Sequence, residues 1–156
     1  MKEFGKAFGE AAYKVASKMG GTKSQGKCAL AVGDALSMVM GEQVAKQYRG
    51  NAWTWISKVK MSNLWRFLKQ SKDTTNLPAG SLVIWDKQPA HPYGHIEVAD
   101  GNGHLCSDFI RSDKLALYRN NPDNIIPLLF VPAELQLQNV GDNLPAKVRV
   151  VASALN

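Results

Sequence analysis

The 156-residue chain is long enough to bury a substantial core, and its hydrophobic fraction of 45% argues against a disordered protein. Its formal net charge of +6 and sequence pI of about 9.4 suit an anionic partner, such as nucleic acid, an anionic membrane surface or bacterial cell wall. The lysines do not form a continuous run, so charge alone selects none of these classes.

Two further features bear on the cellular compartment. Residues 1–6 lack the apolar core of a signal peptide, and no apolar run approaches the roughly 20 residues needed to cross a bilayer. We therefore expect synthesis in the cytoplasm without a signal peptide and without membrane insertion, so that action elsewhere requires another machine for export. The two cysteines, Cys28 and Cys106, form either one bridge or two free thiols.

The first part of the chain predicts helices. Residues 4–19 place apolar side chains on one stripe and end at a Gly-Gly pair, which is typical of an amphipathic helix. A second helix is expected over residues 28–40, because its apolar residues recur at helical spacing. A short helix is expected around residues 43–48, and another over residues 63–70, where apolar residues again follow a helical spacing.

The character of the chain then changes to short β-branched and aromatic runs separated by turns. The predicted strands are residues 81–85, 94–99 and 104–109, with further candidates at 124–131 and 148–152. Residues 100–103, Asp-Gly-Asn-Gly, are typical of a hairpin turn. Helices followed by an antiparallel meander predict an α+β fold in a single domain over residues 1–156.

Cys28 stands at a position suited to a nucleophile. It falls in the first turn of the helix predicted over residues 28–40, after the polar residues Ser24 and Gln25. The positive end of the helix dipole stabilises a thiolate there, and the unpaired backbone N–H groups of the first turn can hold an oxyanion. The alternative is that Cys28 is a small buried hydrophobic residue, as free cysteines often are.

The predicted hairpin supplies a candidate base. If residues 100 and 103 flank the turn, opposed residues sum to 203, so His95 lies opposite Asp108 and Glu97 opposite Cys106. Asp108 would then orient the imidazole, with Glu97 as the alternative carboxylate; the competing interpretation is a chance His–Asp pair on a solvated face. The other face carries the apolar residues Ile96, Val98, Leu105 and Phe109.

Four segments together resemble a known superfamily. They are Ser24-x-Gly26-Lys27-Cys28-Ala29, the run from Ala79 to Trp85, the run from Tyr93 to Gly103, and Cys106-Ser107-Asp108-Phe109. In order and spacing they resemble the NlpC-like and CHAP superfamily of papain-like cysteine amidases and peptidases. The resemblance implies a papain-like fold with N-terminal helices packed on an antiparallel sheet and a core of about residues 22–131. It also implies that Cys28 is the nucleophile, His95 the general base and Asp108 the orienting residue.

The same resemblance implies a substrate and a setting. The Ser-Asp-Phe after the hairpin resembles that of phage lysins and of type VI secretion amidase effectors. A catalytic domain followed only by the extension 132–156 is similar to a secreted effector acting in the periplasm of a target bacterium. The implied activity is hydrolysis of peptide bonds in peptidoglycan, without a cofactor. The implied partners are peptidoglycan stem peptides, a cognate immunity protein and a secretion apparatus. Which amide is cut stays open.

Other functions remain as alternatives. One is a phage endolysin-type wall hydrolase, and another is a non-catalytic structural protein that kept the fold. The basic charge and the tryptophans suggest a nucleic-acid-binding module, although no motif or basic stripe supports it. A zinc site would need ligands from Cys28, His95, His104 and Cys106, whose spacing matches no familiar ligand pattern, so we expect no metal.

Overall fold

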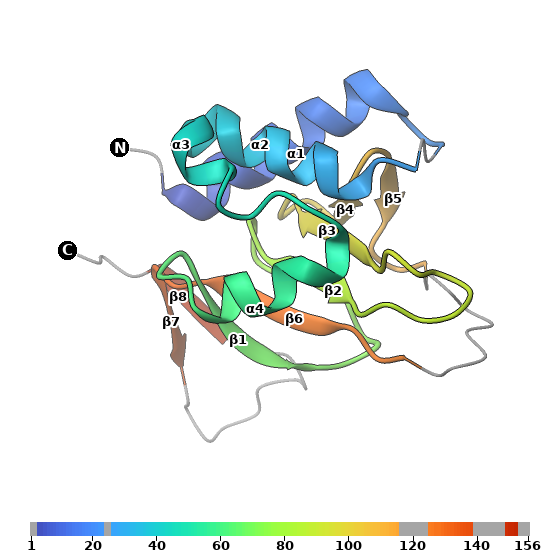
Figure 1. The fold of residues 1–156 in the computed structure, drawn as a ribbon. Coiled ribbons are helices and arrows are strands. Elements are labelled where there is room, and N and C mark those ends of the chain that lie inside the picture. Colours follow the sequence, from blue (N-terminus) through green and yellow to red (C-terminus); the bar gives the residue numbers. More distant parts are fainter. Residues whose placement is uncertain (1–2, 24–25, 116–124, 139–148, 153–156) are drawn as a thin grey trace.

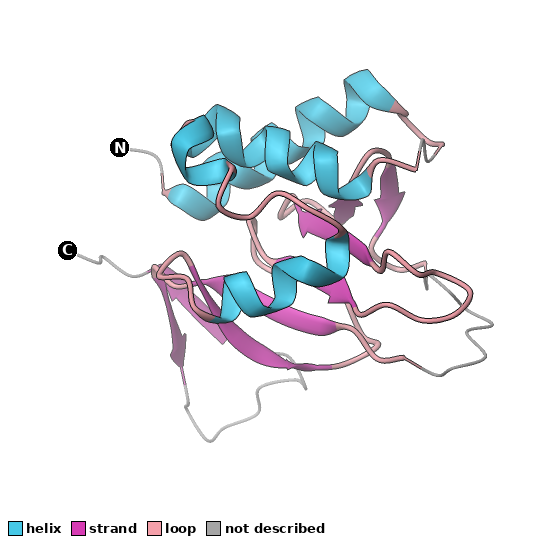
Figure 2. Cartoon of the chain, viewed as in Figure 1, coloured by secondary structure: helices cyan, strands magenta, loops and turns pink. Residues whose placement is uncertain are grey.

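The computed structural model describes residues 3–23, 26–115, 125–138 and 149–152. Helices pack on a six-stranded antiparallel sheet, so the predicted α+β class is confirmed (Figures 1 and 2). None of the helices within these residues is long and apolar enough to span a membrane. The expectation of a single domain stays a prediction.

The two long helices have the predicted bounds. Helix α1 spans Phe4–Met19 and α2 spans Cys28–Met40, and they pack against each other over the sheet (Figure 1). Glycine on the buried face of α1 also lets this helix approach the sheet closely. A Cβ on Gly9 would lie 3.1 Å from the carbonyl oxygen of Ala99. The first helix is therefore held down directly on the end of strand β3, described below.

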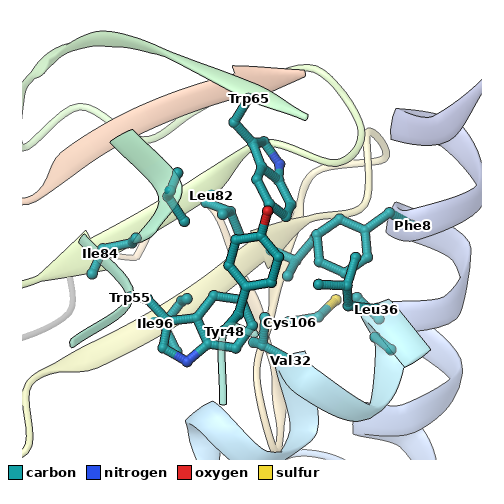
Figure 3. Close-up of a cluster of buried hydrophobic side chains, with 14 of the residues drawn as sticks. Phe8, Val32, Leu36, Tyr48, Trp55, Trp65, Leu82, Ile84, Ile96 and Cys106 are labelled. Atoms are coloured by element: carbon teal, nitrogen blue, oxygen red, sulfur yellow. The ribbon is translucent and has the colours of Figure 1, made fainter. Parts of the chain in front are cut away.

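Three short helical segments follow α2. Their bounds are Glu42–Ala45 for α3, Ala52–Thr54 for the 3-10 turn η1 and Trp55–Lys60 for α4. Two tryptophans in this part of the chain belong to the core, since Trp55 is fully buried and Trp65 is only 2% exposed. Figure 3 shows both rings beside Tyr48 in the cluster between helices and sheet.

The large sheet has the strand order β1-β6-β2-β3-β4-β5. Its strands are β1 Trp65–Gln70, β2 Leu82–Trp85, β3 His95–Ala99, β4 His104–Cys106, β5 Ile110–Ser112 and β6 Leu128–Pro132. Because β6 inserts between β1 and β2, the sheet is not a simple meander. Strands β7 (Leu135–Gln138) and β8 (Arg149–Ala152), both in the C-terminal extension, form a separate two-stranded sheet.

The helix predicted over residues 63–70 is wrong, because this segment is the edge strand β1. It pairs with β6 from Trp65 to Gln70, with a bulge between Phe67 and Lys69. Trp65 is buried, while Phe67, two residues further along the strand, is 48% exposed. Pairing with the distant strand β6, rather than local propensity, decides the conformation.

The hairpin between β3 and β4 is also one residue out of the predicted register. Val98 pairs with Cys106 and Ala99 with Leu105, so opposed residues sum to 204. The cause is the turn: the Asp100 carboxylate accepts the backbone N–H groups of Asn102 and His104, which closes a three-residue loop. Gly101 and Gly103 take positive φ values of 83° and 89°, which suits this loop.

The shift moves whole side chains to the other face of the sheet. Leu105 joins Ala99, Val83 and Leu129 in a second cluster, away from Ile96 and Val98, which pack in the main core. Cys106 takes the place expected for an apolar neighbour and packs in that main core (Figure 3). The predicted opposition of His95 to Asp108 is therefore wrong, as is that of Glu97 to Cys106.

Candidate active site

Cys28 is the first residue of α2, as its sequence context predicts. The preceding Lys27 is the N-cap residue and makes no side-chain cap hydrogen bond. Instead, the backbone N–H of Lys27 donates to Oδ2 of Asp108 at 2.9 Å, and the Ser107 hydroxyl lies 3.2 Å from Oδ1. Asp108 is fully buried, so a carboxylate from the segment after β4 fixes the start of the helix that presents the thiol.

His95 begins β3, next to the start of α2. Its side chain is only 8% exposed, it lies against the Cys28 thiol, and its Nε2 makes an ion-pair contact with Glu97. Burial lowers the pKa of the ring, but the interactions with Cys28 and Glu97 outweigh burial and raise the pKa of His95 to about 9. At neutral pH the imidazole beside the thiol therefore holds a proton.

Glu97 is the carboxylate beside this imidazole. Residues 95 and 97 project from the same face of β3, and Oε2 of Glu97 lies 3.5 Å from Nε2 of His95. The side chain of Glu97 is completely buried. Burial raises its pKa, but hydrogen bonds to and charges on His95 and Arg111 act against burial and lower the pKa of Glu97 below its usual value. Glu97 is thus held as a buried anion.

Arg111 on β5 completes the group. Its Nε and Nη2 atoms donate to Oε2 and Oε1 of Glu97 at 2.6 and 2.8 Å, and the residue is 8% exposed. Arg111 is not among the site residues predicted from the sequence, because β5 was not predicted. A basic residue next to the apolar Ile110, just after the hairpin, was the available signal.

Of the residues predicted for the site, the structure brings Cys28, His95 and the alternative carboxylate Glu97 together. Asp108 contacts Lys27 and Ser107. A catalytic role for Asp108 stays a prediction. Its hydrogen bond to the helix start instead gives it a direct part in placing Cys28.

A pocket of about 390 Å³ opens beside the thiol. It is lined by Gly26, Lys27, Cys28, Ala29, Leu30, Arg49, Gly50, Asn51, Ala52 and Tyr93. The lining contains two basic residues and no acidic residue, and Tyr93 at its rim is 66% exposed. The thiol thus faces a cavity large enough for part of a peptide chain.

Cys106 and His104, the two further ligands that a zinc site would need, have contacts of their own. Cys106 is a free, fully buried thiol whose pKa is raised by burial, and Cys28 is likewise free. His104 is held through Nδ1 by Asp100 at 2.7 Å. Across the described ranges no group of three or more histidine, cysteine or acidic side chains is arranged to hold a metal ion.

No family model and no curated protein matches the chain. Among solved structures, the chain is similar to the native type VI effector–immunity complex Tae3–Tai3 from Ralstonia pickettii. The TM-score is 0.56 at 20% sequence identity, and the match covers 78% of this chain and 96% of that chain. This similarity is one of fold. It confirms the expectation of a fold like that of a type VI effector.

Proposed function

We propose that the protein is a cysteine hydrolase that cleaves peptide amides of bacterial peptidoglycan. The observation that supports this most directly is the contact between a thiol at the start of a helix and a buried imidazole that holds a proton at neutral pH. A thiolate–imidazolium pair beside a pocket is the arrangement that nucleophilic catalysis at an amide requires.

In the first step, the Cys28 thiolate attacks the amide carbonyl carbon, and the C=O electron pair moves onto oxygen. The backbone N–H groups of the first turn of α2 have no carbonyl partner within the helix, and we assign the N–H of Cys28 to the oxyanion. His95 then donates its proton to the leaving amine as the C–N bond breaks, which leaves a thioester and a neutral imidazole.

In the second step, the neutral imidazole of His95 accepts a proton from water, whose oxygen attacks the thioester. Collapse of this second oxyanion releases the carboxylic acid product and returns the thiolate beside a protonated ring. With Nε2 directed to Glu97, we assign Nδ1 to both proton transfers. Glu97 orients the ring and stabilises its charge, which is the third role of such a site.

The substrate assignment depends on the resemblance and on charge. Peptidoglycan is an anionic polymer, which suits a chain of net charge +6 and a pocket with Lys27 and Arg49 in its lining and no acid. The fold shared with a type VI effector also supports an antibacterial protein, delivered to the periplasm of a target cell and blocked by an immunity protein.

Digestion of purified peptidoglycan, followed by mass spectrometry of the released muropeptides, tests this proposal. We expect wild-type protein to release peptides and Cys28→Ala to release none. His95→Ala should retain only residual activity, since a catalytic base contributes about 10²–10⁴-fold. The products also identify the bond that is cut. Intact muropeptide profiles after wild-type treatment would overturn the proposal.

Cys106→Ala is the matched control, because it removes the other thiol from the core without touching the pocket. It should digest peptidoglycan at close to the wild-type rate if it remains folded. A loss of activity in a folded Cys106→Ala protein equal to that in Cys28→Ala would contradict the assignment of the nucleophile.

A further inference from the structure

Arg111 takes no part in the steps above, yet its guanidinium is buried directly behind them. Two of its nitrogens donate to the two oxygens of Glu97 at 2.6 and 2.8 Å. The third, Nη1, donates to the backbone carbonyl oxygens of Ser112, at 3.4 Å, and of Leu115. All three nitrogens thus have acceptors, so the orientation of the guanidinium plane is fixed by its own strand and the turn after it.

This fixed plane determines the plane of the carboxylate. Oε2 of Glu97 is shared, because it accepts from Nε of Arg111 at 2.6 Å and lies 3.5 Å from Nε2 of His95. A bidentate pair prevents rotation of the carboxylate about its last bond, which a single contact does not. The direction in which Oε2 faces the imidazole is therefore set from β5, a different strand from the one that holds His95 and Glu97.

We propose that Arg111 is a positioning residue, which acts through Glu97 to hold the His95 ring against Cys28 and to limit the negative charge that the ring experiences. The catalytic consequence rests on the proposed hydrolase function. The arrangement of the side chains does not, and it can be tested separately.

The charges around the ring give the inference a direction. The groups that act on the pKa of His95 are Cys28 from α2 and Glu97 from its own strand, while β2 contributes the uncharged ring of Trp85. Arg111 from β5 acts on Glu97 and offsets its charge without removing it. Loss of that cation leaves the negative charge of Glu97 facing His95 without this offset, so the ring should bind its proton more tightly.

A ¹⁵N NMR titration of the imidazole rings tests this without any substrate, with His95 assigned from a His95→Gln spectrum. In Arg111→Met we expect the midpoint of His95 to rise by about one unit relative to wild type. Arg66→Met is the matched control, since Arg66 lies on β1 at the opposite edge of the sheet, and it should leave the midpoint unchanged. An unchanged or lowered midpoint in folded Arg111→Met would overturn the proposal.

Arg111→Lys distinguishes the effect of the two-pronged contact with Glu97 from the effect of the positive charge. It also provides a test if Arg111→Met does not fold. Lysine keeps the positive charge but cannot form the two-pronged contact. We expect a wild-type His95 midpoint together with an approximately tenfold lower kcat and an unchanged KM on peptidoglycan peptides. A folded Arg111→Lys protein with wild-type kcat would overturn the positioning role. If wild-type protein itself cleaves nothing, the proposed function fails, whereas the titration still decides the inference.

Discussion

Within the described residues, two Arg–Glu pairs have nearly the same geometry in opposite surroundings. On the helical side, Arg49 donates to both oxygens of Glu42 at 2.8 Å and to Asp34 at 2.9 Å. In the sheet, Arg111 donates to both oxygens of Glu97 at 2.6 and 2.8 Å. The side chain of Glu42 is 55% exposed and that of Glu97 is completely buried.

The contrast shows what burial adds to one and the same contact. The pair with the exposed Glu42 is screened by water and salt, so this carboxylate can be removed at little cost. In the sheet, the carboxylate has lost its hydration and depends on its protein partners, so removal of one leaves an uncompensated charge. The buried pair also touches the imidazole of His95, which lies beside the Cys28 thiol, and this is why we connect it with function.

The largest loss of stability should come from breaking the buried Glu97–Arg111 pair. Glu97→Ala leaves the Arg111 guanidinium buried without its counter-ion, and we expect it to lower the free energy of unfolding by about 3–5 kcal/mol. Urea denaturation followed by circular dichroism measures this loss. The double variant Glu97→Ala/Arg111→Met is the control, and it should recover part of the stability. A single variant as stable as wild type would mean that the pair contributes no more than a surface contact.

The dependence of stability on pH should be the next largest effect. The pKa of His95 is raised from 6.5 to about 9 in the folded protein, so the native state binds more protons than the unfolded chain between these values. The stabilisation is thus fully present below about pH 6.5 and is lost as the pH rises through about 9. We expect a fall in the free energy of unfolding on the order of 2–3 kcal/mol over this interval.

Denaturation curves at pH 6.5 and 9.5 measure that fall, with His95→Gln as the comparison. The variant cannot exchange the proton, so its stability should change much less over the same interval. Equal slopes for both proteins would show that the imidazole is not the group responsible.

The sequence predicts the local features of the fold better than those set by distant pairing. The bounds of α1 and α2 follow from apolar periodicity and the flanking glycines, and both are confirmed. Strand β1 was missed because its partner β6 lies far along the chain, and an edge strand with a bulge shows no clean alternation. Local patterns contain no information about which strand will lie alongside.

In the site, too, the features set by local sequence were predicted better than those set by strand pairing. Cys28 in the first turn of α2 and His95 on the strand that is β3 were both identified from the sequence, and they do come together. The choice of carboxylate depended on the turn, where the side chain of Asp100 closes a loop of three residues instead of two. That one-residue difference removes the predicted opposition of His95 and Asp108, while Glu97 is near the ring through simple alternation along the strand.

Asp108 should therefore give a smaller effect than Glu97, and of a different kind. Asp108→Ala removes the acceptor at the start of α2, and we expect a loss of about 1–2 kcal/mol in the free energy of unfolding with a reduction in kcat of less than tenfold. Denaturation and muropeptide release, measured on the same preparations, test both numbers. A reduction by about 10²-fold or more in a stably folded variant would restore Asp108 as the residue that orients the imidazole.

The smallest effect should come from the exposed pair. Hydrogen bonds from Arg49 and Ser37 lower the pKa of Glu42 to about 2, so the pair contributes above pH 4.5 and its contribution is lost as the pH falls through about 2. At neutral pH we expect Glu42→Gln to leave the free energy of unfolding nearly unchanged, because solvent screens the interaction and Asp34 still holds Arg49.

Any difference between Glu42→Gln and wild type at low ionic strength should vanish in 1 M salt, whereas the loss of stability in Glu97→Ala should persist, since a buried pair is screened much less. Denaturation curves at the two salt concentrations compare the pairs directly. If Glu42→Gln were as destabilising as Glu97→Ala, or if salt removed both losses alike, burial would not be what separates them.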